Sequence, residues 1–304
     1  MDIRALRYFT EVVQYKGFSR AAEALFVTQP AISRSIQKLE HELGFPLLVR
    51  DTGGVTLTDE GAILYEHARR ILVQFQCMNK ALQDKSGPLT GTLNVGLPPV
   101  IASTWFAGII MAFTSRHPQV ELKIFELGTK QMAEAMTDGT VETAAVMLPF
   151  DEQLFDLHRF ATDRLMLLVN HQHPLAAKKQ VSFADIIREP FVFFSEAFRI
   201  NDLVRSACGI YSTEPVVAGR SNHLDLILAM VRAGVGITLL PDSMWRERTA
   251  DGLVLLPVTD PVLSYDLALA GVRGGYQSRS CRAWNALAME ILGIPYVTGA
   301  GHLL

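Results

Sequence analysis

The chain has 304 residues, which is enough for two or three domains with apolar cores. Its 28 basic and 31 acidic residues give a net charge of −3, which argues against a protein that binds a polyanion over most of its surface. Any nucleic-acid contact must therefore be confined to a local surface. No export signal precedes the first amphipathic segment, and no apolar run reaches the roughly 20 residues that span a bilayer. We therefore expect a cytoplasmic protein without membrane contact.

The first elements expected along the chain are three helices. Apolar residues recur at helical spacing from Ile3 to Val13, which predicts an amphipathic helix. Ser19 is expected to cap a short second helix whose small residues permit a close crossing. Thr28 is expected to cap a third helix that ends at Gly44. The buried stripe of this third helix is predicted to contain Ile32, Ile36, Leu39 and Leu43.

The outer face of the third helix favours DNA recognition. It carries amide, hydroxyl and basic groups, with no acidic residue between Thr28 and Leu39. Arginine can bond guanine, glutamine can bond adenine, and serine or lysine can bond phosphate. For an isolated helix, the alternative to DNA recognition is that these polar residues are merely exposed to solvent. The covering first helix, together with two strands expected at residues 46–50 and 55–58, instead predicts a winged helix-turn-helix.

An ordered set of residues makes this part of the chain resemble LysR-type transcriptional regulators. The set runs through Phe18-Ser19-Arg20-Ala21-Ala22, Gln29-Pro30-Ala31-Ile32-Ser33, Leu39-Glu40, Glu42-Leu43-Gly44, Leu47-Leu48, Arg50, Leu57-Thr58 and Gly61. The resemblance covers residues 1–88 and implies that Gln29, Pro30, Ser33 and Arg34 sit in the groove. It also implies that Arg50 of the wing contacts the DNA backbone.

The wing departs from the family pattern at its tip, where Asp51, Gly53 and Gly54 replace further arginines. The outer helix face and the resemblance together define the expected DNA-binding residues. They are Ser19, Arg20, Thr28, Gln29, Pro30, Ser33, Arg34, Gln37, Lys38 and Arg50.

A long helix is predicted to follow the wing, beginning at Thr58 and two acidic residues. Apolar residues then recur at spacings of four and three, as in a two-helix coiled coil, at Leu64, Ala68, Ile71, Phe75, Met78 and Leu82. Packing within its own domain is the alternative; the resemblance, in which this helix pairs subunits, favours a homodimer. We expect a DNA-binding domain at 1–58, a dimerising linker helix at 59–87 and a hinge at 88–91.

Beyond Gly91, short apolar runs alternate with amphipathic stretches, as in βαβ units with a parallel sheet. A helix is expected at 100–116, and strands at 164–169 and 265–271. Two such sets predict two lobes with a ligand cleft at the strand ends. Landmarks such as His117-Pro118, His173-Pro174-Leu175 and the run at 231–241 extend the resemblance over essentially the whole chain.

The resemblance implies an effector-binding domain akin to periplasmic solute-binding proteins. The expected fold is therefore multidomain: a winged helix-turn-helix, mainly α with a β-hairpin wing, and an α/β domain at 92–304 with two Rossmann-like lobes. Lobe I is expected at 92–161 and 267–304, and lobe II at 162–266.

Helix starts and the loops before them provide the candidate effector-binding residues. Free N–H groups and hydroxyls at such starts suit an anion, and Arg199 can hold a carboxylate through two hydrogen bonds. Some family members bind carboxylates through a threonine that matches Thr129. For each residue taken alone, ordinary helix capping or a solvated charge is the alternative to ligand binding. Taken together, the residues favour a small organic or aromatic acid as the ligand. The set is Pro99, Ser103, Thr104, Thr129, Ser195, Phe198, Arg199, Asn222 and His223.

Other functions are disfavoured by the residues that the chain lacks. It has no GxSxG, HExxH or P-loop motif, and Gly234-Val235-Gly236 stands at the end of an expected helix, so we expect no enzyme, catalytic residue or cofactor. Cys77, Cys208 and Cys281 are few and far apart, which predicts neither disulfides nor a metal site and disfavours thiol sensing through Cys208.

We expect a bacterial LysR-type regulator that activates transcription, represses it, or does both. The resemblance implies that dimers pair into a homotetramer through the effector domains. Effector binding between the lobes is expected to change how the protein bends double-stranded promoter DNA and how it contacts RNA polymerase. A cytoplasmic solute-binding or ligand-sensing protein without promoter control is the alternative.

Overall fold

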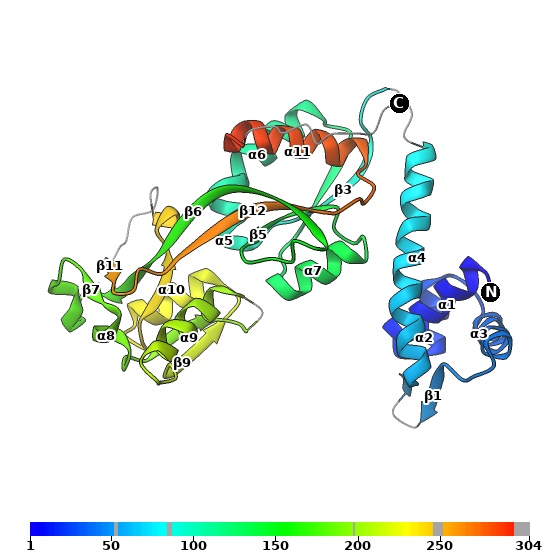
Figure 1. The fold of residues 1–304 in the computed structure, drawn as a ribbon, viewed down its shortest axis with the longest axis horizontal. Coiled ribbons are helices and arrows are strands. Elements are labelled where there is room, and N and C mark those ends of the chain that lie inside the picture. The colour runs from blue at the N-terminus through cyan, green and yellow to red at the C-terminus, as the bar shows by residue number, and fades with distance from the viewer. Residues whose placement is uncertain (52–53, 84–86, 197, 246–251, 295–304) are drawn as a thin grey trace. The chain divides into compact units, whose positions relative to one another are not determined.

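The computed structural model describes residues 1–51, 54–83, 87–196, 198–245 and 252–294 (Figure 1). The chain divides into two compact units, the first comprising Met1–Ser86 with Thr137–Gly139 and the second the rest of the chain from Gly87 onward. Within the described residues, every helix is too short or too polar to cross a bilayer.

The first unit is a winged helix-turn-helix followed by a long helix, as predicted. Its elements are α1 (Ile3–Gln14), α2 (Phe18–Ala24), α3 (Gln29–Leu43), the antiparallel hairpin β1 (Leu48–Asp51) and β2 (Gly54–Leu57), and α4 (Asp59–Gln83). The apolar faces meet in one core that contains Phe9, Ile32, Ile36, Leu39 and Leu47. The Glu40 carboxylate accepts the backbone N–H groups of Leu47 and Leu48 at 2.8 and 3.3 Å. These bonds fix the wing to the end of α3.

The helix ends agree with the sequence at two positions and differ at two. Gly44 ends α3 with φ +85°, and the Thr58 hydroxyl accepts the Gly61 N–H at 2.9 Å, as a cap of α4. The prediction that Ser19 caps α2 is wrong, because the buried Phe18 already belongs to that helix and Gly17 is its N-cap. Thr28 occupies the N-cap position of α3, but its side chain accepts no capping bond.

The turn between α2 and α3 contains an aromatic residue in a costly conformation. Phe26 has φ +54°, and its side chain is 96 % exposed. A left-handed backbone costs about 1–2 kcal/mol for most residues and less for asparagine. We therefore expect Phe26→Asn to stabilise the first unit by roughly 0.5–1 kcal/mol in thermal unfolding without DNA. Phe26→Leu, which keeps the conformational cost, is the control, and equal stabilities of the two variants would contradict this prediction.

Lobe I of the second unit has a sheet with helices on both faces. The parallel strands β3 (Gly91–Gly96), β4 (Val120–Phe125) and β5 (Thr143–Met147) lie in the order β4-β3-β5. Helices α6 (Ala107–Arg116) and α11 (Arg279–Leu292) cover one face, and α7 (Thr129–Thr137) covers the other (Figure 1). The single helix expected at 100–116 consists of three segments, α5 (Pro99–Ile101), the π-helical η1 (Ala102–Phe106) and α6.

Lobe II is built from short strands and helices. The parallel pair β8 (Phe191–Phe194) and β9 (Val217–Ser221) packs against α9 (Ile200–Ile210) and α10 (Leu224–Arg232). The other elements of this lobe are η2 (Pro174–Ala177), β7 (Val181–Ser182), α8 (Phe183–Ile186), β10 (Thr238–Pro241), η3 (Asp242–Trp245) and β11 (Leu253–Thr259).

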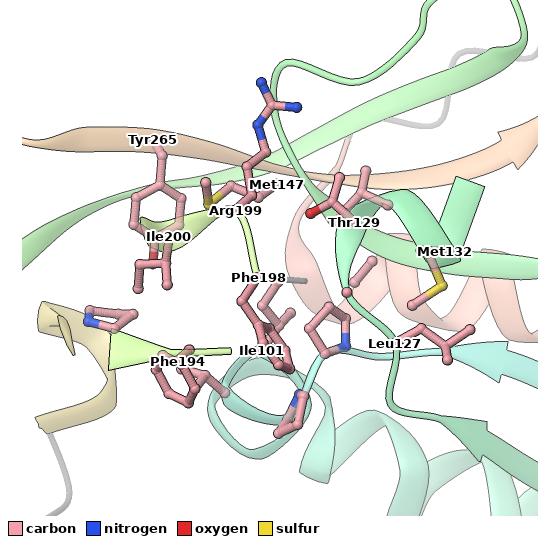
Figure 2. Close-up of a pocket in the computed structure, with 17 residues that line it drawn as sticks. Ile101, Leu127, Thr129, Met132, Met147, Phe194, Phe198, Arg199, Ile200 and Tyr265 are labelled. Atoms are coloured by element: carbon pink, nitrogen blue, oxygen red, sulfur yellow. The ribbon is translucent and has the colours of Figure 1, made fainter. Parts of the chain in front are cut away.

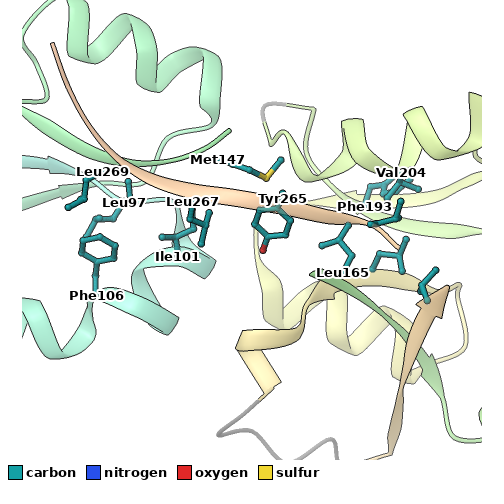
Figure 3. Packing of buried hydrophobic residues seen from close by; sticks show 14 of the residues in the cluster. Leu97, Ile101, Phe106, Met147, Leu165, Phe193, Val204, Tyr265, Leu267 and Leu269 are labelled. Atoms are coloured by element: carbon teal, nitrogen blue, oxygen red, sulfur yellow. The ribbon is translucent and has the colours of Figure 1, made fainter. Parts of the chain in front are cut away.

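Two long antiparallel strands, β6 (Phe155–Asn170) and β12 (Ser264–Val272), run side by side from one lobe to the other (Figure 1). Buried side chains of β12, such as Leu267 and Leu269, pack in the core of lobe I, and Leu165 of β6 packs in lobe II (Figure 3). The expected lobe boundaries at 161/162 and 266/267 therefore fall inside these strands.

The two crossing strands correct two expectations about the sheet. The strand expected at 164–169 is only the second half of β6, because the first half mixes polar with apolar residues, is mostly half-buried and lacks a continuous apolar run. The sheet is mixed rather than parallel, since β12 pairs antiparallel with both β5 and β6.

Candidate functional site

Helix α3 presents a polar face opposite its buried stripe. Ile32, Ile36 and Leu39 are buried at 0–1 % exposure, and Leu43 packs against the same core. Ser33 is half-buried on the other face. The exposed residues of that face, with the N-cap, are Thr28, Gln29, Pro30, Arg34, Gln37 and Lys38.

The basic residues near α3 differ in their own contacts. Arg34 donates from Nε to the Pro30 carbonyl at 3.3 Å, and no other described residue bonds its guanidinium. Lys38 lies 3.9 Å from Glu42, and the exposed Arg20 donates to the Lys16 carbonyl at 3.1 Å. Arg34 is therefore the residue of this face with guanidinium nitrogens left for a base edge. Ser19 is exposed on α2, whereas the Arg50 side chain lies outside the described residues.

The apolar stripe of α4 has two parts. Ala68 is fully buried, and Leu64 packs against the core of the winged helix-turn-helix. The remaining residues of the stripe, Ile71, Phe75, Met78 and Leu82, are 39–74 % exposed. Thus the first two positions belong to the domain itself, and the last four form an uncovered apolar stripe.

A pocket lies between the two lobes of the second unit (Figure 2). It follows the carboxyl ends of β3, β5 and β8, where ligands enter open α/β sheets. Its cavity volume is about 70 Å³, several times the roughly 10–15 Å³ that one water molecule requires. Lobe I contributes Ile101, Leu127, Thr129 and Met132, and lobe II contributes Phe194, Phe198, Arg199 and Ile200.

The structure brings four of the nine expected effector residues to this pocket, namely Pro99, Thr129, Phe198 and Arg199. The Ser103 hydroxyl instead donates to the Val100 carbonyl of the preceding segment, α5, at 3.2 Å. His223 is exposed at the N-cap of α10. Thr104, Ser195 and Asn222 are also outside the pocket lining.

The pocket also contains Tyr265, which sequence reasoning missed because it lies within an apolar strand. Its hydroxyl lies 3.4 Å from the carboxylate of the buried Asp163, its neighbour on β6. Burial, and then the Asp163 charge, raise the pKa of Tyr265, so the phenol stays protonated and can donate this bond. Asp163 also accepts the Ser243 hydroxyl. The wall at Tyr265 is therefore fixed to both crossing strands and to η3.

Asn201 is a second missed residue, and it positions the start of α9. Its amide is buried and donates to the carbonyls of Phe194 and Ser195, both at 2.9 Å. These bonds join the end of β8 to the start of α9, where Phe198 and the N-cap Arg199 precede Ile200, the first residue of the helix. No pattern in the sequence indicates this role, because an asparagine at a helix start also fits ordinary capping.

Comparisons with known proteins place the chain in a family. The model for the LysR substrate binding domain matches residues 86–292, and the model for the bacterial regulatory helix-turn-helix protein of the lysR family matches residues 3–62. The chain belongs to the LysR family of transcriptional regulators. It is thus a DNA-binding regulator with an effector-binding domain and, as predicted, not an enzyme.

The similarity extends over nearly full-length relatives. The chain is 34 % identical to the uncharacterised HTH-type regulator YwbI of Bacillus subtilis, covering 93 % of this chain and 94 % of the relative. It is 29 % identical to the hydrogen peroxide-inducible genes activator of Pectobacterium carotovorum, with 91 % and 94 % covered. A full-length OxyR variant from Pseudomonas aeruginosa superimposes with a TM-score of 0.71 at 27 % identity, covering 97 % and 96 % of the chains.

Proposed function

We propose that this regulator acts in the cytoplasm as a homodimer that pairs into a tetramer and reads a pseudo-palindromic promoter site with its two α3 helices. The polar face of α3, which lacks acidic residues between Thr28 and Leu39, supports this assignment. The uncovered stripe of α4 supports dimerisation, because a row of exposed apolar side chains at coiled-coil spacing is stabilised by a second helix.

The effector in this proposal is a small organic or aromatic acid bound in the pocket between the lobes. Its differential affinity for two arrangements of the assembly changes DNA bending and access of RNA polymerase. Arg199 at the pocket supports the acidic class, since a guanidinium suits a carboxylate.

The DNA contact is tested by Arg34→Ala. Loss of a bidentate base contact is expected to cost about 1–3 kcal/mol of operator affinity and to relax base preference at one position of each half-site. Fluorescence anisotropy with operator variants at fixed salt measures both effects. Arg116→Ala, which removes the same charge from α6 in the other unit, is the control. Equal operator binding by Arg34→Ala and the intact protein would remove Arg34 from the interface.

The relatives named as activators of hydrogen peroxide-inducible genes raise a thiol-based response as a second candidate, which the environment of Cys208 disfavours. Its side chain is fully buried, and burial followed by the charge of Glu214 raises the pKa of the thiol. Because the thiolate is the reactive form, less of Cys208 is reactive at neutral pH than of a free cysteine.

We accordingly expect Cys208 to resist a disulfide reagent in the native protein and to react once guanidinium unfolds the chain. Cys77→Ser provides a background in which the thiols are the described Cys208 and Cys281. Hydrogen peroxide is expected to leave operator affinity unchanged. A change in operator affinity that disappears in Cys208→Ser would establish a redox response.

A further inference from the structure

The charge of the pocket between the lobes comes from one side chain. Arg199 is the only charged residue among the described residues that line it. The neighbouring acid, Glu196, lies at 3.3 and 3.4 Å from Arg205 and Arg220 instead. No described residue forms an ion pair or hydrogen bond with the Arg199 guanidinium; only its backbone carbonyl is bonded, by the Asp202 N–H at 2.9 Å. Arginine remains protonated throughout the physiological pH range, so the pocket carries one positive charge that an anion can neutralise.

Two helix starts reinforce the positive potential near this guanidinium. Thr129 is the first residue of α7, and Arg199 is the N-cap of α9 with no side-chain capping bond. Both residues line the pocket. The first N–H groups of a helix and its dipole favour negative charge, and the Thr129 hydroxyl adds a donor. The pocket lining therefore provides a cation and several hydrogen-bond donors for a carboxylate.

The remainder of the pocket is apolar. Ile101, Leu127 and Phe194 lie away from the Arg199 guanidinium, which extends to the opposite side of the pocket in Figure 2. Besides Thr129 and Arg199, the polar side chain of the described lining is Tyr265, whose hydroxyl lies beside the Asp163 carboxylate. A second negative charge on a ligand would lose its hydration without a cation to replace it.

We infer that the pocket selects a compact monocarboxylate with a hydrocarbon body, held at Arg199 and Thr129, and rejects both dicarboxylates and neutral isosteres. This assignment rests on the proposed function, because it takes the pocket to be the effector site. The cavity, of about 70 Å³, is small beside the roughly 300–1,000 Å³ of common ligand pockets and favours a small body such as a branched aliphatic group or a single ring.

Two matched ligand series test the selection by calorimetry on the full chain. The aliphatic series is 3-methylbutanoate, its amide, and 3-methylglutarate, which replaces one methyl hydrogen by a second carboxylate. The aromatic series is benzoate, benzamide and terephthalate. At least one monocarboxylate is expected to bind, with its amide and dicarboxylate about 10- to 100-fold weaker, as for a charge-assisted bond lost or a charge left unpaired. Failure of both monocarboxylates, or equal binding of a dicarboxylate or amide, would overturn the inference.

Variants then assign the carboxylate to its partners. Arg199→Gln is expected to weaken the bound monocarboxylate about 10- to 100-fold, whereas Arg205→Gln, on the same helix and outside the pocket, leaves it unchanged. Unchanged binding by Arg199→Gln would also overturn the assignment. Operator affinity in the absence of ligand separates this failure from that of the proposed function. If the protein binds its operator but does not select monocarboxylates, only the inferred ligand class is wrong. If the intact protein does not bind an operator, the proposed function as a DNA-binding regulator is wrong.

Discussion

Gly61→Ala is expected to destabilise the winged helix-turn-helix by about 3 kcal/mol or more and to abolish operator binding. A Cβ atom at position 61 would lie 2.0 Å from the carbonyl oxygen of Leu47. That oxygen cannot easily move, because it accepts the Thr58 N–H at 3.0 Å while the Leu47 N–H is bonded to Glu40. Shifting α4 instead would break the cap that Thr58 makes with Gly61.

Gly44→Ala is the matched control for that substitution. Gly44 has φ +85°, and no atom of the described residues lies within 4 Å of an added Cβ, so alanine there meets only the cost of the left-handed conformation, about 1 kcal/mol. Thermal unfolding followed by circular dichroism, with operator anisotropy, compares the two variants. An equal loss of stability in both variants would show that the close approach of the Leu47 carbonyl to Gly61 adds no steric cost to Gly61→Ala.

Phe75→Glu is expected to weaken the homodimer at least about 100-fold, because each subunit would lose an apolar contact and place a carboxylate in the seam. Phe75 is 39 % exposed in the single chain, between the similarly exposed Ile71 and Met78. Since a dimer binds two half-sites at once, we expect operator affinity to fall as the homodimer weakens. Sedimentation equilibrium measures the dimer, and anisotropy measures the operator complex.

Gln74→Glu introduces the same charge one position away on α4, at an exposed residue outside the stripe. We expect its dimer dissociation constant to match that of the intact protein. If Phe75→Glu also leaves this constant unchanged, the stripe of α4 is not a subunit interface, and the exposed apolar residues require another explanation.

The sequence predicted the features that depend on local spacing. The stripe of α3, the turn at Gly44, the start of α4 at Thr58 and the wing all follow from residues within a few turns of one another. Local rules failed at Ser19, because the burial of Phe18 extends α2 toward its N-terminus. Tertiary packing there outweighs a favourable capping residue.

The sheet and the pocket were less predictable because they depend on distant segments. The antiparallel pairing of Asp163 with Tyr265 joins residues about one hundred positions apart, and no short pattern specifies it. The predicted ligand contacts are mostly polar residues at helix starts, yet most of the pocket wall is apolar and cannot be distinguished in the sequence from core residues, as at Ile101 and Met147. Thr129 was identifiable from the resemblance to family members that bind carboxylates through a matching threonine, and Arg199 because a guanidinium suits a carboxylate.

The position of β12 has a consequence for synthesis of the protein. In the sheet, β12 lies between β5 and β6, although of the described strands it is the last to leave the ribosome. At translation rates of about 5–20 residues per second, lobe I waits roughly ten seconds or more between the emergence of β3 and that of β12. During this interval β5 and β6 expose unpaired edges that can pair with other chains. Nascent chains released before Ser264 are therefore expected to be substrates for chaperones and proteases, even though their winged helix-turn-helix is complete.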